Sequence, residues 1–307
     1  MSFSGEVKEE LAAQISASRH CQIAELAAMV CYGGRMEQKE EGQSRLLIQT
    51  ENEKVIRKGF TLLEKSFNIC TGVMGKGPYS LRVEKEEQIT RLLRGLKLSE
   101  GSGQTDGRID TVNALLIKNA CCRRAYLRGA FLVTGSMSDP EKSYHLEFVC
   151  ITSRQAVQLQ EIIRDFHIEA RIVTRKNHFI VYMKEGAGIV DLLNVMGAHI
   201  SLMNLENLRI VKEMRNSINR RVNCETANIT KTVNAASKQI ADILLIQETM
   251  GLQRLQDGLR ETAEIRLEYP DATLKELGQY LNPPVGKSGV NHRLRKLSEI
   301  AEGIRDQ

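Results

Sequence analysis

The sequence lacks the features that would place the protein in a membrane or outside the cell. None of its apolar runs approaches the ~20 residues that a membrane-spanning helix needs. The first residues, MSFSGEVKEELAAQ, carry acids and no apolar signal core, so we expect a short amphipathic helix there rather than a secretory peptide. The chain has 307 residues, 42% apolar and 26% charged, which is ordinary for a globular protein. We therefore expect a cytoplasmic protein of two or three domains.

The seven cysteines include no Cys-x-x-Cys pair, and no pair of cysteines stands near a histidine at the spacing typical of metal ligands. Cys31 and Cys150 lie within the apolar runs MVCY and FVCI, which favours buried, reduced thiols. Metal binding is the alternative. We expect no metal site and no cofactor.

The sequence does contain an internal repeat with an offset of 101 residues. ELAAMVCYGGRM (25–36) matches YLRGAFLVTGSM (126–137), with Gly34 aligned to Gly135. Downstream, each copy continues with a β-like run, a helical pattern, two further β-like runs and a closing amphipathic helix. The pattern predicts an α+β fold in which two α-β-α-β-β-α units, about 20–97 and 112–198, form one pseudo-twofold domain. The Gly- and Ser-rich stretch 97–111 is predicted to be a linker or an exposed loop.

The first helix of each copy is rich in small residues, which let two helix backbones approach closely. We therefore expect helices 24–33 and 125–134 to pack side by side, each stopped by a glycine in a left-handed turn. The alternative is two unrelated helices rich in alanine and glycine.

Residues 204–251 have a helical pattern with few glycines and no proline, and positive charge collects near their start. Residues 209–221 contain five basic residues and only one acidic residue. They are predicted either to contact phosphates or to form a solvated helix face, and the two readings are equally favoured. These residues are Arg209, Lys212, Arg215, Arg220 and Arg221.

The last segment has the pattern of a helix-turn-helix. Thr273 is placed to cap a helix over 273–281, two prolines interrupt the chain within 282–287, and Ser288 is placed to cap a second helix. Val290, Leu294 and Leu297 would face inward, leaving a basic outer face. The candidate DNA-binding residues are Thr273, Lys275, Lys287, Ser288, Asn291, His292, Arg293, Arg295 and Lys296. Asn291, His292 and Arg293 suit base edges, whereas Lys287 and Lys296 suit phosphates. The alternative is a small helical bundle with a basic edge.

The two repeat helices resemble the LAGLIDADG motif of homing endonucleases, and the whole chain resembles the WhiA family of Gram-positive bacteria. AYLRGAFLVTGSMSDP (125–140), NRRVNCETAN (219–228) and ATLKELGQYLNPPVGKSGVNHRLRKL (272–297) carry the second resemblance. It implies a LAGLIDADG-like domain joined to a C-terminal helix-turn-helix. It also implies that this helix-turn-helix accepts the connection 282–287, which is longer than the usual three or four residues. We place an N-terminal helix at 1–19, the LAGLIDADG-like domain at 20–198, a basic linker helix at 199–221 and the helix-turn-helix domain at 222–307.

The resemblance to the nucleases also predicts what is missing. In these enzymes an acid just before the last glycine of each motif helix holds a divalent metal, and here Gly33 and Thr134 occupy those positions. Glu37 and Asp139 are close in sequence but lie beyond the helix ends. We therefore expect that the chain keeps the LAGLIDADG fold but has lost the ability to cleave DNA.

Together these features predict a non-catalytic transcription regulator that binds double-stranded DNA on the nucleoid. The family resemblance implies roles in cell division, chromosome segregation or sporulation, and in actinobacterial relatives a WhiB-like iron–sulfur partner. The alternatives are an active LAGLIDADG endonuclease, and a protein–protein interaction module that binds DNA incidentally. The sheets of the repeats carry only a few basic residues that could make a second contact with DNA.

Overall fold

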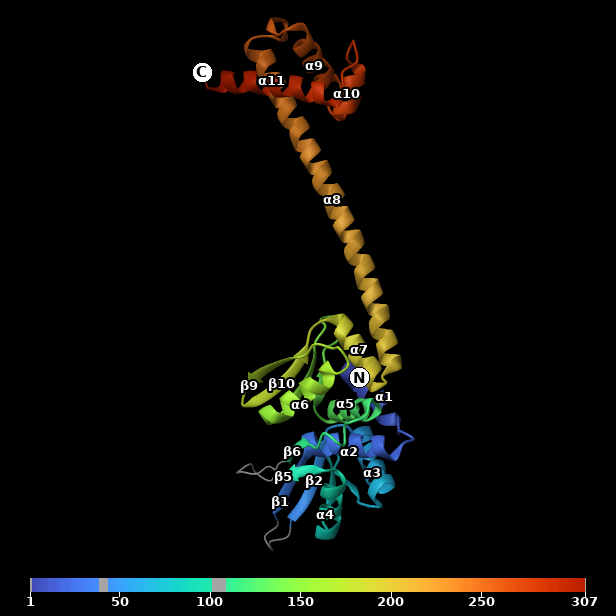
Figure 1. Ribbon diagram of the computed structural model, residues 1–307. Coiled ribbons are helices and arrows are strands. Elements are labelled where there is room, and N and C mark those ends of the chain that lie inside the picture. Colours follow the sequence, from blue (N-terminus) through green and yellow to red (C-terminus); the bar gives the residue numbers. More distant parts are fainter. Residues whose placement is uncertain (1, 39–43, 101–108, 307) are drawn as a thin grey trace. The chain divides into compact units, whose positions relative to one another are not determined.

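The computed structural model describes residues 2–38, 44–100 and 109–306 (Figure 1). The chain divides into two compact units, residues 1–212 and residues 213–307. Among the described helices, none is both long enough and apolar enough to cross a membrane.

The first half of the repeat unit is a helix followed by a four-stranded antiparallel sheet with two further helices. The strand order is β1-β2-β4-β3. The elements are α2 (Arg19–Gly33), β1 (Gly34–Gln38), β2 (Ser44–Thr50), α3 (Glu53–Phe67), β3 (Val73–Met74), β4 (Tyr79–Val83) and α4 (Glu86–Gly95).

The second half repeats this arrangement. Its sheet has the equivalent order β7-β8-β10-β9. The elements are α5 (Ala120–Thr134), β7 (Gly135–Met137), β8 (Leu146–Cys150), α6 (Ser153–Arg164), β9 (Arg171–Arg175), β10 (His178–Met183) and α7 (Gly186–Met196). The predicted repeat and its α+β class are therefore confirmed.

The predicted order of elements within each repeat was incomplete by one strand. β1 and β7 follow the motif helices directly, so each repeat reads α-β-β-α-β-β-α. Both extra strands are short and their sequences, GRMEQ and GSM, show no apolar alternation. They are strands because β2 and β8 pair with them, Gly34 opposite Ile48 and Gly135 opposite Phe148.

The helices α2 and α5 pack against each other along the seam between the repeats, as predicted. A Cβ atom at Gly129 would lie 2.3 Å from the Glu25 carbonyl oxygen, and one at Gly33 would lie 2.4 Å from a methyl carbon of Val133. Real Cβ atoms do not approach that closely, so the small residues set the distance between the helices.

The predicted left-handed turn at the end of each motif helix is wrong. Gly34 and Gly135 are extended, with φ of −89° and −73°. Both are glycines for a steric reason instead, because a Cβ atom would lie 2.3 Å from the Val30 carbonyl oxygen at Gly34 and 2.3 Å from the Phe131 ring at Gly135. The chain passes straight from helix into strand at these two positions.

A charged cluster is buried beside the seam. Glu25 is fully buried, and its carboxylate lies 2.5 Å from the Lys58 ammonium and 2.9 Å from both Nε and Nη2 of Arg128. Arg128 also donates to the hydroxyl of Ser16 and to the carbonyl of Met196. Burial lowers the pKa of the Lys58 ammonium to about 8, against the effect of the neighbouring carboxylate. The cluster joins both repeats.

Two peripheral segments complete the repeat unit. The N-terminal helix α1 (Phe3–Ala13) buries Val7 and Leu11, which confirms the amphipathic pattern. The ends of the predicted linker pair as strands, β5 (Leu98–Glu100) with β6 (Ile109–Val112), so they are not loop. The middle of that linker, 101–108, lies outside the described residues.

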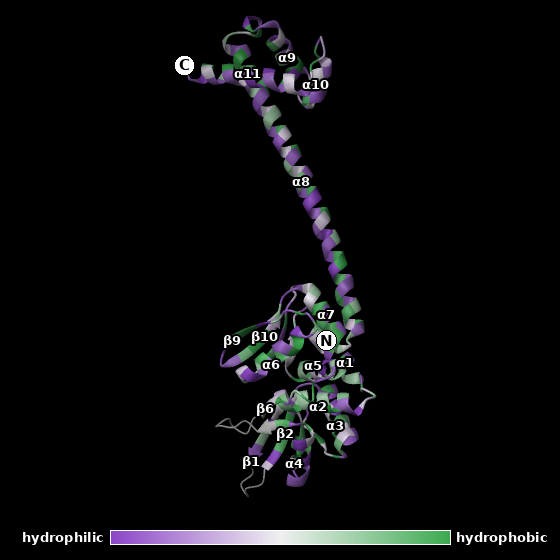
Figure 2. Ribbon diagram, in the orientation of Figure 1, coloured by the Kyte–Doolittle hydropathy of each residue, from purple (hydrophilic) through white to green (hydrophobic). Residues whose placement is uncertain are grey.

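The second unit is helical. α8 (His199–Thr249) has 51 residues and begins in the first unit, so it runs through the predicted boundary at residue 221 without a break. It is followed by the 3-10 turn η1 (Leu252–Arg254), α9 (Asp257–Glu268), α10 (Leu274–Tyr280) and α11 (Lys287–Arg305). A core of leucine, isoleucine, valine and alanine side chains joins the end of α8 to α9, α10 and α11. Along α8, by contrast, apolar and polar residues are interleaved (Figure 2).

Candidate nucleic-acid interface

The helix-turn-helix begins with a capped α10. The hydroxyl of Thr273 accepts from the Glu276 backbone N–H at 3.4 Å, and the Glu276 carboxylate accepts from the Thr273 N–H at 2.7 Å. This reciprocal pair fixes the start of the helix, as the sequence predicted. The Thr273 hydroxyl oxygen therefore serves as an acceptor within the fold, and its O–H can still donate.

The turn between α10 and α11 depends on Gly278, which the sequence reasoning did not single out. The Val285 N–H donates to the Gly278 carbonyl at 2.9 Å, so the connection folds back on α10. A Cβ atom at residue 278 would lie 2.0 Å from the Val285 carbonyl oxygen. A connection longer than the usual three or four residues is therefore packed by a close backbone contact.

α11 starts earlier than predicted. Its N-cap is Gly286, whose carbonyl accepts from the Val290 N–H at 3.1 Å, and Lys287 is the first helical residue. Ser288 is therefore inside the first turn and does not cap the helix. Glycine is accepted at the N-cap position, and the extended Gly286 starts the helix without a side-chain hydrogen bond.

The two faces of α11 separate as the spacing predicted. Val290, Leu294 and Leu297 are each at most 1% exposed and belong to the core of the unit. The opposite side carries exposed polar and basic side chains, which we call the α11 outer face: Lys287, Ser288, Asn291, His292, Arg295 and Lys296. Within the described chain, none of these six side chains makes a hydrogen bond or ion pair. Lys275 on α10 is exposed as well.

Arg293 differs from the other predicted base readers. It is half-buried, and its Nη1 donates to the Gly258 carbonyl at 3.2 Å and to the Thr262 hydroxyl at 3.3 Å. Both partners belong to α9. The guanidinium therefore ties α11 to α9 and is not directed outward in this structure.

The basic residues of α8 also divide into two groups. Arg209 pairs with Glu206 at 2.7 Å, and Lys212 donates to the Pro140 carbonyl at 2.6 Å and lies over the Tyr144 ring. These two are used within the repeat unit. Arg215, Arg220 and Arg221 are exposed on α8, where Arg221 has a 3.4 Å contact with Glu225. Only the second group presents charge outward.

Among the described residues, the last turns of the two motif helices, which end at Gly33 and Thr134, hold no acidic pair. Thr134 donates its hydroxyl to the Ala130 carbonyl at 3.1 Å. Glu37 lies on β1 and contacts Arg45 at 2.6 Å and Arg35 at 2.7 Å, and the Arg45 hydrogen bond lowers the pKa of its carboxyl. Asp139 accepts from the Glu141 N–H at 2.9 Å. Glu37 and Asp139 are thus both engaged locally.

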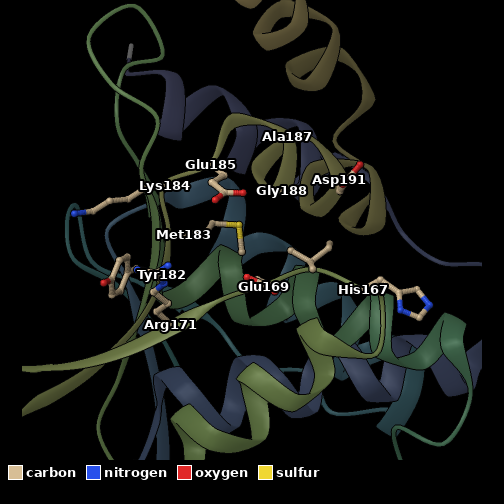
Figure 3. Close-up of a pocket in the computed structure, with 11 residues that line it drawn as sticks. His167, Glu169, Arg171, Tyr182, Met183, Lys184, Glu185, Ala187, Gly188 and Asp191 are labelled. Atoms are coloured by element: carbon tan, nitrogen blue, oxygen red, sulfur yellow. The ribbon is translucent and has the colours of Figure 1, made fainter.

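A pocket lies in the second repeat between β10 and α7 (Figure 3). Its wall mixes acids, Glu169, Glu185 and Asp191, with Arg171 and Lys184. The Lys184 ammonium lies 5.5 Å from the centre of the Tyr182 ring. The pocket contains none of the predicted site residues, and its mixed charge favours no single ligand class.

The opposite ends of the motif helices bring together four potential soft-metal ligands that the sequence analysis did not connect. His20 and Cys21 come from the first turn of α2, and Cys121 and Cys122 from the first turn of α5. One ligand atom from each residue lies within 4.8 Å of every other. Burial raises the pKa of the Cys21 thiol to about 12, and the neighbouring thiols add to this.

The folds of the two units define the class of this protein, a LAGLIDADG-like domain followed by a helix-turn-helix domain. Family models match three consecutive segments: the WhiA N-terminal LAGLIDADG-like domain at 19–99, the WhiA LAGLIDADG-like domain at 123–215 and the WhiA C-terminal HTH domain at 218–301. The chain belongs to the WhiA family.

Relatives match the chain from end to end. The probable cell division protein WhiA of Lachnoclostridium phytofermentans is 53% identical over 99% of this chain and 100% of its own length, and that of Clostridium beijerinckii is 48% identical over 99% of each. The crystal structure of full-length DUF199/WhiA from Thermatoga maritima is similar, with a TM-score of 0.59 and 26% identity over 98% of each chain.

Proposed function

We propose that the chain is a non-catalytic transcription regulator that binds double-stranded DNA on the nucleoid and acts in cell division. The α11 outer face carries this proposal. It places basic side chains beside an amide and an imidazole on one exposed helix, and the opposite face of that helix is anchored in a core. A helix of this kind enters the major groove, where side chains contact base edges and phosphates.

The residues of the outer face suit different parts of the duplex. Asn291 offers an amide that matches an adenine edge, and Arg295 offers a fork that matches a guanine edge. Lys287 and Lys296 suit phosphates, because an ammonium on a flexible stem is a point charge. Since Arg293 is held by α9, we assign base reading to Asn291, His292 and Arg295.

The absence of catalysis is proposed from the ends of the motif helices. A divalent ion that activates water needs carboxylate oxygens from both helices. Gly33 has no side chain, and the Thr134 hydroxyl is neutral and bonded within its own helix. Glu37 is four residues beyond Gly33 in an extended strand, which amounts to roughly 13 Å at the usual rise, and it is paired with two arginines.

A role in cell division is supported by the names of the relatives, which are called probable cell division proteins. Chromosome segregation and sporulation are the further processes that the family resemblance implies. A WhiB-like partner remains a prediction for actinobacterial relatives.

The experiment is chromatin immunoprecipitation with sequencing, in cells that express the full chain from its own locus. We compare the parent with Lys287→Ala/Arg295→Ala/Lys296→Ala, called the α11 variant. The matched control is Lys65→Ala/Lys85→Ala/Arg94→Ala, which removes three exposed basic side chains from the first repeat. The parent and the control should enrich the same discrete promoters, with transcription changing at those genes, and the α11 variant should lose them. Enrichment that survives in the α11 variant would contradict the proposal.

A second candidate function, protein interaction, is favoured by one observation. α8 exposes a series of large apolar side chains, Met214, Ile218, Val222, Ile229 and Val233, each 52–64% exposed. A row of exposed large apolar side chains on one helix commonly marks a surface that contacts another protein. If the α11 variant keeps its full effect on division while losing DNA, this function is the better account.

A further inference from the structure

The cluster of His20, Cys21, Cys121 and Cys122 lies at the starts of the two motif helices. These starts are the opposite ends from Gly33 and Thr134, where the related nucleases hold their metal. The offset of 101 residues that relates the repeats also relates Cys21 to Cys122 and His20 to Cys121. Each helix therefore contributes an adjacent pair of side chains from an equivalent position in its first turn, across the pseudo-twofold seam.

We propose that these four side chains bind one zinc ion that joins the two repeats. Three sulfur atoms and one imidazole nitrogen form a complete tetrahedral donor set, and three cysteines with one histidine is an established combination for structural zinc. Soft thiolate ligands select zinc over magnesium or calcium, which require oxygen. All four positions are filled by protein, so the site is structural and has no open position for chemistry.

The distances between the four ligand atoms are close to those in a tetrahedral zinc site. At zinc–sulfur and zinc–nitrogen bond lengths of about 2.3 and 2.0 Å, ligands at tetrahedral corners lie roughly 3.5–3.8 Å apart. Nδ1 of His20 lies 3.2 Å from Sγ of Cys122 and 3.4 Å from Sγ of Cys21. Every pair of the four ligand atoms is within 4.8 Å. No pair of these atoms is therefore more than about 1 Å beyond the largest separation in a tetrahedral site.

The surroundings also suit a metal. Cys21 and Cys122 are 6% and 3% exposed and pack with Ala24 and Ala125 in a small apolar cluster, so their side of the site is dry. His20 and Cys121 are exposed, which leaves a path from solvent for the ion. Burial raises the pKa of the Cys21 and Cys122 thiols, so both would bind the ion as thiolates by releasing their protons to solvent.

The site would act as a clamp between the repeats. The seam helices already share the Glu25 ion cluster near their middle, and a zinc ion would join their first turns. Because the ligands are assembled only in the folded state, the binding free energy adds to the stability of the repeat unit. This inference does not depend on DNA binding, so either proposal can fail without the other.

The test uses the full chain, purified in a phosphine reductant without chelator, loaded with zinc and dialysed. Elemental analysis should give about one zinc per chain. Cobalt in place of zinc should give the charge-transfer bands of thiolate ligands and the visible bands of tetrahedral cobalt. Removing the metal with a strong chelator should lower the Tm of the repeat unit by roughly 5–10 °C.

Variants decide whether the metal is at this cluster. His20→Ala and Cys121→Ser alter exposed ligands and are expected to fold, and each should weaken zinc affinity by at least about tenfold. The matched control is Cys70→Ser/Cys224→Ser, which removes two exposed cysteines outside the cluster and should bind zinc like the parent. The proposal is overturned if the loaded parent retains no zinc, if it retains only iron or copper, if the control loses zinc as His20→Ala does, or if mass spectrometry of the reduced preparation finds Cys21 and Cys122 joined as a disulfide.

Discussion

The seam of the repeat unit and the α11 outer face use charged residues in opposite ways. At the seam, Glu25, Lys58 and Arg128 are buried and satisfy one another. On α11, Lys287, Arg295 and Lys296 are exposed and have no partner within the described residues. A buried charge with partners holds structure, whereas an exposed row of one sign on an anchored helix is available to a polyanion. The buried cluster therefore belongs to the scaffold of the repeat unit, and the α11 outer face is the candidate interface.

The largest expected effect comes from breaking the buried cluster. Glu25→Ala leaves the Lys58 ammonium and the Arg128 guanidinium buried beside each other, which should destabilise the repeat unit by about 3–5 kcal/mol. Hydrogen exchange of the amides in α2 and α5, read by mass spectrometry, measures this opening. The control is Glu53→Ala, which removes an exposed pair with Arg57 and should cost less than about 1 kcal/mol. Equal costs for the two variants would remove the distinction on which the comparison rests.

The close approach of the seam helices gives the next largest effect. Gly129→Ala places a Cβ atom against the backbone of α2, so we expect a loss of about 1–3 kcal/mol in the stability of the repeat unit. Gly188→Ala on α7 is the control, because its Cβ atom would meet only Ile168 at 3.8 Å. There the better helix propensity of alanine should make the change neutral or stabilising by up to about 1 kcal/mol. Thermal melts of the two variants check the contrast, and a Gly129→Ala protein as stable as the parent refutes it.

Two arginines on one helix sharpen the comparison within α11. Arg293→Ala removes hydrogen bonds to α9 and should lower the stability of the helical unit by about 1–2 kcal/mol. Arg295→Ala should leave stability within about 0.5 kcal/mol and weaken binding at a cognate site by about 1–3 kcal/mol. Chemical denaturation and fluorescence anisotropy on the same preparations separate the two quantities. If Arg293→Ala lost sequence discrimination at unchanged stability, it would be a base reader after all.

The smallest expected effect is none. Supercoiled plasmid and cognate fragments incubated with the purified chain and magnesium or manganese should stay intact, because the motif helices end without acids. Divalent-dependent nicking that disappears in Glu37→Ala or Asp139→Ala would show that one of these acids restores a catalytic metal site.

Much of this architecture was predictable because it depends on the spacing of residue types along the sequence. The 101-residue offset, the small residues of the seam and the inward row of Val290, Leu294 and Leu297 each follow from spacing along the chain. β1 and β7 were missed because strand pairing, rather than their own polar residues, makes them strands. The extended φ of Gly34 and Gly135 was missed because glycine marks both left-handed turns and tight contacts.

The missed parts of the candidate sites depend on tertiary contacts. Helical spacing places Arg293, three residues after Val290, beside the buried row and Arg295 on the other side, but only the position of α9 shows which groups the Arg293 guanidinium contacts. Gly278 is constrained by a carbonyl seven residues away. The four soft ligands are two adjacent pairs separated by about 100 residues, a spacing that resembles no local metal motif and becomes a cluster only when the repeats pack.

The measurement that tests the central claim most directly is a salt titration of DNA binding by the full chain. Fluorescence anisotropy with a cognate duplex gives the slope of log K against log salt for the parent, the α11 variant and the matched control from the first repeat. We predict that the α11 variant loses affinity and that its slope is shallower by about two units, one for each of the phosphate contacts that Lys287 and Lys296 make. The control should follow the parent. An α11 variant with the affinity and slope of the parent would contradict the assignment of this face to DNA.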